Sequence, residues 1–113
     1  MTLARFRQLC LALPGATEQM QWEVDAVFKV GGKMFAVACT DHRKYPHVPM
    51  CSFKCDDDSF ATLVEQEGIV PAPYLARAQW VALERWDALT DREIAAAVKI
   101  AYQTVRGRLP KKV

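Results

Sequence analysis

Two β-rich segments separated by a pair of glycines constrain the fold of this chain more than any other feature. The segments read AVFKV at 26–30 and KMFAVAC at 33–39, with Gly31 and Gly32 between them. Both central positions of a type I′ turn need positive φ, which glycine adopts readily, so we predict an antiparallel hairpin. In this register Val30 faces Lys33 and Phe28 faces Phe35.

Alternation of side chains along the hairpin predicts two different faces. The face expected to pack on the core carries Phe28, Val30, Phe35 and Val37. The outer face is expected to carry Val27, Lys29, Met34, Ala36 and Ala38. A sheet built on this hairpin therefore has one buried face and one face available to water or to a partner.

The segments around the hairpin have their own periodicities. Apolar residues at intervals of three and four predict a helix over 3–13, which Pro14 and Gly15 end, and an extended segment follows over 17–24. Residues 40–49 form a polar loop with two prolines, and 50–55 alternate as a strand that sends Cys51, Phe53 and Cys55 inward. The first half of the chain is thus a helix followed by four strands.

The second half is predicted to hold two further helices and one strand. Asp56 caps a helix that ends at Gly68, and a turn with a short helical piece follows over 71–77. Residues 80–84 form a strand with Val81 and Leu83 inward and with Trp80, Ala82 and Glu84 on the outer face. Thr90 and Glu93 form a capping box before an amphipathic helix, whose apolar stripe is Ile94, Val98, Ala101 and Val105.

This order of elements does not alternate strand and helix, so a doubly wound parallel sheet is excluded. We predict an α+β fold in which helices flank one face of an antiparallel sheet, with residues 1–113 as a single domain. The length of 113 residues suits one hydrophobic core.

Composition restricts the function classes only loosely. Fifteen Lys and Arg stand against thirteen Asp and Glu, a net charge of +2 that neither requires nor excludes a polyanionic partner. No apolar run approaches the roughly 20 residues of a membrane span, and the first residues lack a signal-peptide pattern. We expect a soluble cytoplasmic protein.

The four cysteines are expected to be reduced core thiols. Cys51 and Cys55 with His42 or His47 form an alternative metal set, which their C-x3-C spacing on a strand disfavours. The acidic run 56–58 could also hold a hard metal ion, but acids at a helix N-terminus complement the helix dipole. We therefore predict neither a metal nor a cofactor.

An ordered series of motifs resembles the MmcQ/YjbR family along nearly the whole chain. The motifs are LPGATE at 13–18, Trp22, FKVGGKMFA at 28–36, SFKC at 52–55, Trp80-Val81 and LPKK at 109–112. The resemblance implies a bacterial protein with a frataxin/CyaY-like fold that binds DNA, with the sheet hairpins as paired wings. Frataxins bind iron through an acidic ridge on the first helix, whereas residues 2–13 here contain Arg5 and Arg7 and no acid. Iron binding is therefore disfavoured.

A candidate nucleic-acid site follows from cations that could meet phosphates and an aromatic ring on which a base could stack. On the outer sheet face we place Lys29, Ser52, Lys54 and Trp80, with Lys33 at the hairpin tip and Arg43 and Lys44 in the adjacent loop. The alternative is that the charges are merely solvated and that Trp80 is covered. A second cationic set comprises Arg106, Arg108, Lys111 and Lys112, for which the helix dipole is a sufficient explanation. DNA binding at such a site would be weak and independent of sequence.

Catalysis is not expected, because a nucleophile with a base and an orienting acid is not evident. His42 and His47, the only histidines, lie in one polar loop where solvated side chains are ordinary. The competing function is a protein-, peptide- or self-binding module that uses an open sheet edge or the Trp80 face. Pairing of Lys29 and Lys54 with Glu23 or Glu84 would favour this competitor over nucleic acid.

Overall fold

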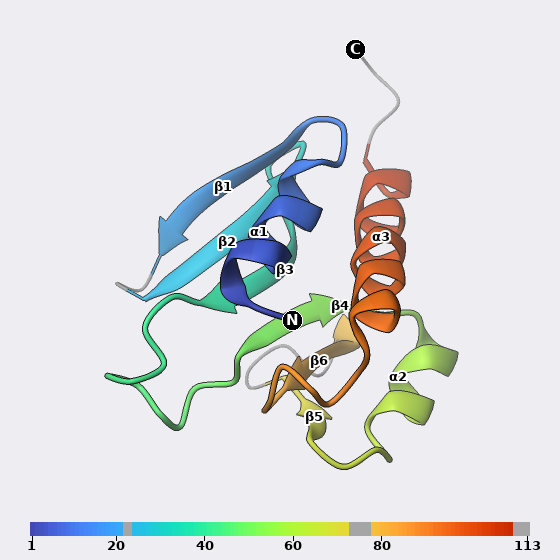
Figure 1. The fold of residues 1–113 in the computed structure, drawn as a ribbon. Helices are drawn as coiled ribbons and strands as arrows, with labels where there is room; N and C mark the ends of the chain where they lie inside the picture. The colour runs from blue at the N-terminus through green and yellow to red at the C-terminus, as the bar shows by residue number, and fades with distance from the viewer. Residues whose placement is uncertain (22–23, 73–77, 110–113) are drawn as a thin grey trace.

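A computed structural model describes residues 1–21, 24–72 and 78–109 (Figure 1). Its elements in chain order are α1 (Leu3–Leu11), β1 (Ala16–Gln21), β2 (Asp25–Val30), β3 (Lys33–Cys39), β4 (Cys51–Lys54), α2 (Asp57–Leu63), β5 (Ile69–Pro71), β6 (Trp80–Leu83) and α3 (Asp91–Gly107). The strands form one antiparallel sheet in the order β1-β2-β3-β4-β6-β5. The α+β class with an antiparallel sheet is confirmed.

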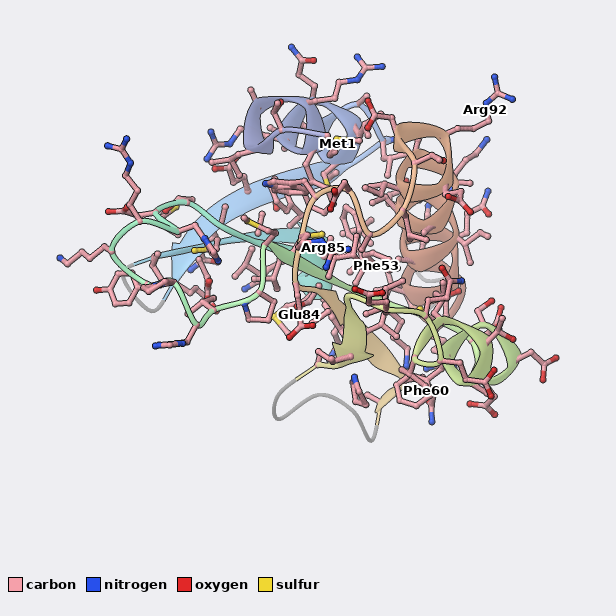
Figure 2. The ribbon with its side chains drawn as sticks, turned by 60° about the horizontal axis from the view of Figure 1, so that its bottom comes forward. Met1, Phe53, Phe60, Glu84, Arg85 and Arg92 are labelled. Atoms are coloured by element: carbon pink, nitrogen blue, oxygen red, sulfur yellow. The ribbon has the colours of Figure 1, made fainter. Side chains whose placement is uncertain are left out.

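The three helices contribute to the same hydrophobic core on one face of the sheet (Figure 1). Buried side chains of α1 and α3 meet Phe28, Phe53 and Leu83 from the strands, and α2 adds Phe60 and Leu63 at the margin. The stripe predicted on α3 is buried as expected, while Arg92 projects into solvent (Figure 2). Helical coverage of one face leaves the other face for a smaller cluster around Trp80 and Ala82.

The predicted hairpin is present, with one error in its register. Gly31 and Gly32 have φ of 58° and 81°, and Val30 pairs with Lys33 as expected. Phe28, however, pairs with Ala36 rather than Phe35, because the register shifts between Phe28 and Lys29. This bulge places one extra residue on β3. For the residues of β3 that come after it, each side chain therefore points to the opposite face of the sheet from the one predicted.

The bulge corrects part of the predicted division into faces. Ala36 and Ala38 belong to the core on the helix side, whereas Val37 packs with the outer cluster. Phe35 keeps its predicted place in the core, and Met34 keeps its predicted place on the outer face. Ala36 and Ala38 therefore lie under the helices where Val37 was expected.

Several boundaries also differ from the predicted ones. Helix α1 ends at Leu11 rather than at 13, and α2 ends at Leu63 rather than at Gly68. Strand β5 was not predicted, since three residues that end in a proline give no periodicity to read. The turn predicted over 71–77 falls mostly on 73–77, which lie outside the described residues, as do Trp22, Glu23, Lys111 and Lys112.

The capping predictions hold in detail. Asp56 accepts a hydrogen bond from the Ser59 N–H at 2.7 Å, which begins α2. At α3, the Glu93 N–H donates to Thr90 Oγ1 at 3.1 Å, and the Thr90 N–H donates to Glu93 Oε1 at 2.9 Å. Both helices thus begin at the residues whose side chains satisfy their first free N–H groups.

All four cysteines are free thiols and buried. Within the residues that the structure describes, no helix combines the length and apolar character that a membrane crossing requires.

Candidate functional site

Several elements meet at the end of the sheet that carries the β2–β3 turn. Strand β4 reaches this end at Lys54, which pairs with Trp80 at the start of β6. The end of α3 lies there as well. The side chain of Leu109, just after α3, is so close to Gly31 that a Cβ added at Gly31 would lie 2.5 Å from Leu109 Cδ1. We call this region the hairpin end.

A hollow of about 500 Å³ opens at the hairpin end. Its lining comes from the hairpin, from the facing ends of β4 and β6 and from the end of α3. The lining residues are Lys29, Gly32, Lys33, Met34, Lys54, Ala78, Trp80, Val105, Arg108 and Leu109. Among these described residues there are four cations and no carboxylate.

Lys29 and Lys33 bring two of the cations from the hairpin itself. Lys29 is half-buried on β2, and its Nζ donates to Gln19 Oε1 on β1 at 3.0 Å. Lys33 is exposed at the first position after the turn. Both positions agree with the sequence-based expectation of a basic hairpin tip.

Lys54 and Trp80 lie on the predicted outer face but are not exposed there. Lys54 is 6% exposed, and its Nζ donates to the Ala78 carbonyl oxygen. Trp80 is 4% exposed and packs with Ala72 and Ala82. The expectation that Trp80 offers a free ring for base stacking is therefore wrong, since most of its surface is already covered.

The electrostatic setting of Lys54 differs from that of a surface lysine. Burial lowers the pKa of Lys54 below its ordinary value, and the nearby charge of Arg108 lowers that pKa further, while the nearby carboxylate of Asp57 opposes part of this effect. The two cations are thus held close enough to disfavour each other. An anion placed between them would relieve this repulsion.

Ser52, Arg43 and Lys44 do not join the hairpin end. Ser52 is half-buried in the middle of the outer face, between its register partners Val37 and Ala82. Arg43 and Lys44 lie in the loop after β3, whose seven residues separate that loop from the turn by roughly 20 Å. The loop is therefore not adjacent to the hairpin tip, because it leaves from the other end of the same strand (Figure 1).

The loop also carries charge of the opposite sign. Asp41 Oδ1 accepts a hydrogen bond from the Lys44 N–H at 3.3 Å. The Lys44 ammonium lies 5.6 Å from the centre of the Tyr45 ring. Arg43 and Lys44 accordingly form a separate and weaker positive region.

Sequence reasoning did not connect Arg108, Val105 and Leu109 with the hairpin. Arg108 was attributed to the helix dipole, and the other two were read only as part of the α3 stripe and the tail. The missing information is tertiary, because nothing in the local pattern shows that α3 ends beside Gly31. The three-residue spacing of Val105 and Arg108 on one helix face was the only available signal.

Charge pairing is the feature expected to distinguish the two competing functions. In the part of the chain that the structure describes, the ammonium groups of Lys29 and Lys54 have neutral oxygens as hydrogen-bond partners. Ion pairs instead join Arg7 to Glu18 and Arg85 to Asp87, away from the hollow. Glu84 is thus not the hydrogen-bond partner of either lysine there, and Glu23, the other partner named in the prediction, lies outside the described residues.

The thiols do not resemble catalytic nucleophiles. Burial and the nearby charge of Asp56 raise the pKa of Cys55 to about 12, and burial raises the pKa of Cys10 and Cys51 as well. An activated cysteine needs a lowered pKa and access to solvent. Among the described residues, no three His, Cys, Asp or Glu side chains gather in a way that could hold a metal ion.

Fold and site together define a small α+β domain with a cationic, apolar-walled hollow at one end of an antiparallel sheet. A family model described as YjbR matches residues 11–104, a span that includes all six of the strands described above and most of α3. The chain belongs to the YjbR family. No curated protein matches it.

Proposed function

We propose that this protein is a non-catalytic DNA-binding module whose contacts to phosphates lie at the hairpin end. The observation that supports the proposal most strongly is the gathering of Lys29, Lys33 and Arg108 around one opening without a carboxylate among the described lining residues. Cations clustered in this way attract a phosphate backbone by releasing its condensed counterions. A chain with a net charge of only +2 attracts DNA locally rather than over its whole surface.

The proposed binding is weak and independent of sequence. Phosphate contacts position a nucleic acid but do not read its bases. Trp80 is too deeply covered to stack on a base, so the contribution of stacking is absent from this site. Three accessible cations imply that log K falls with log salt at a slope of about −2 to −3.

The buried thiols support the proposal that the protein acts in the cytoplasm, where cysteines stay reduced. The frataxin-like relationship of the fold stays a prediction from the family resemblance.

Fluorescence anisotropy of a labelled oligonucleotide, titrated with protein from low to physiological salt, tests the proposal. We expect a Lys29→Glu/Lys33→Glu variant to bind at least tenfold more weakly than the wild type. An Arg92→Glu/Lys99→Glu variant is the control, because it makes the same change in net charge on exposed positions of α3. Equal losses in the two variants, or no binding by the wild type at low salt, would refute the proposed site.

The edge of the sheet supports a second candidate function, the association of two copies of the chain. Strand β1 is the edge strand next to β2, and Met20 on it is 50% exposed. Light scattering across a concentration series tests this candidate. We expect Met20→Lys to reduce a dimer that Ile100→Lys, at an exposed position on α3, leaves intact. A monomer at every concentration would exclude self-association.

A further inference from the structure

The walls of the hollow at the hairpin end are mainly apolar, which a phosphate-binding surface does not require. Met34 and Trp80 line it from the sheet, and Val105 and Leu109 line it from the end of α3. A volume of about 500 Å³ falls within the range of pockets that enclose small organic ligands. The shape and the wall chemistry therefore suit a discrete molecule with an apolar part.

The cations of the hollow lie at two depths. Lys33 and Arg108 are exposed at the rim, and Lys54 is almost fully buried below them. A buried ammonium is unfavourable unless it has a partner, and the Ala78 carbonyl supplies a neutral one. Asp57 places a carboxylate near Lys54 but does not line the hollow, so a ligand with an anionic head would bring the negative charge that the described lining residues lack.

The backbone beside Lys54 is in an unusual conformation. Gln79 has φ of 58°, a region that disfavours L-residues other than glycine by roughly 1 to 2 kcal/mol. The residues on either side of it, Ala78 and Trp80, both line the hollow. Strained backbone that persists beside a pocket is typical of positions where a site is held in a fixed shape.

We propose that this hollow binds a small amphipathic organic anion, with its carboxylate or phosphate head between Lys54 and Arg108. The short apolar body would lie against Met34, Val105 and Leu109. A DNA backbone does not fit this description, because its phosphodiesters remain hydrated and bring no apolar group to fill the walls. A neutral ligand would leave the repulsion between Lys54 and Arg108 in place.

This site goes beyond the proposed DNA binding and does not depend on it, although both proposals use the exposed cations Lys33 and Arg108. Lys54 distinguishes them, because a buried ammonium contributes little to a phosphate backbone that stays in solvent. The two proposals are also read by different measurements, anisotropy of an oligonucleotide in one case and perturbation of protein signals by a small molecule in the other.

Nuclear magnetic resonance of ¹⁵N-labelled protein tests the site with three probes that share a six-carbon chain: hexanoate, hexyl phosphate and hexanol. We expect at least one of the two anions to shift the amide signals of Gly32, Met34 and Arg108 and the indole N–H signal of Trp80 in a saturable way. Hexanol is expected to bind at least tenfold more weakly. The absence of saturable shifts with both anions, or equal binding of hexanol, would overturn the proposal.

Two variants and one control link the shifts to the hollow. Lys54→Met keeps most of the length of the side chain without its charge, and Arg108→Met removes the guanidinium at an exposed position where folding is not at risk. Each is expected to weaken the binding of whichever anion shifts the wild-type signals at least tenfold, whereas Lys99→Met, an exposed position on α3, is expected to bind as the wild type does. Unchanged binding in Arg108→Met, or equal shifts with inorganic phosphate, would contradict an amphipathic ligand held at this place.

Discussion

The contact between the hairpin turn and the end of α3 can be tested by adding one methyl group at each of two neighbouring glycines. Gly31 and Gly32 both have positive φ, so an alanine at either position is strained by roughly 1 to 2 kcal/mol. At Gly31 the new Cβ would lie 2.5 Å from Leu109 Cδ1. At Gly32 no atom of the described residues lies within 4 Å of the new Cβ.

The difference between the two substitutions isolates the tertiary contact. Pushing Leu109 aside adds about 1 to 2 kcal/mol, the lower part of the range for overpacking, because this side chain lies near the surface. We therefore expect Gly31→Ala to lower the free energy of unfolding by about 2 to 4 kcal/mol and Gly32→Ala by about 1 to 2 kcal/mol.

Urea unfolding of both variants measures these free energies. The slope of each transition is compared with that of the wild type. A Gly31→Ala/Leu109→Ala double variant provides the decisive control, because it removes the obstacle. The double variant should be about 1 kcal/mol more stable than the sum of the two single-substitution losses in unfolding free energy predicts. Equal destabilisation at the two glycines, or strict additivity in the double variant, would refute the packing of Leu109 on the turn.

Three further predictions concern the core, the cap and the thiols. Phe53→Ala should destabilise the fold by about 3 to 5 kcal/mol because the ring is fully buried, whereas Leu11→Ala, at an exposed position, should change urea stability little. Thr90→Ala should lower stability by about 1 kcal/mol through loss of the capping box, measured the same way; an unchanged midpoint would contradict the cap. The raised pKa of Cys55, about 12 in the folded chain against 9.0 for an ordinary thiol, predicts that its contribution to stability is complete below pH 9 and is lost as the pH rises from 9 towards 12. Unfolding midpoints at pH 8 and 10 should show a smaller decline in Cys55→Ala than in the wild type, and an equal decline would show that another group causes it.

Local patterns in the sequence accounted for most of the secondary structure and for both helix caps. The Gly-Gly turn, the alternation of Cys51, Phe53 and Cys55, and the stripe on α3 are each visible in fewer than twenty consecutive residues. Such patterns hold because side-chain periodicity is imposed by the backbone itself. They predicted correctly which side chains of β4 and β6 face the helices, namely Cys51, Phe53, Val81 and Leu83.

The errors arose where tertiary structure overrides the local pattern. The bulge opposite Phe28 has no glycine or proline to mark it, and it reversed the facing of Ala36, Val37 and Ala38. The exposure of Trp80 and Lys54 could not be predicted either, because it depends on neighbouring strands and on packing from distant segments. The structure therefore brings the two lysines of the hairpin and Arg108 to one hollow, and it places the loop that was expected beside them at the other end of β3.

The most direct test of DNA binding at the hairpin end is chemical-shift mapping with a short oligonucleotide on ¹⁵N-labelled protein at low salt. We predict that the perturbed signals belong to Gly32, Lys33 and Arg108, and that those of the loop at 41–48 change little. Perturbation confined to that loop, or none at any position, would contradict the proposed function.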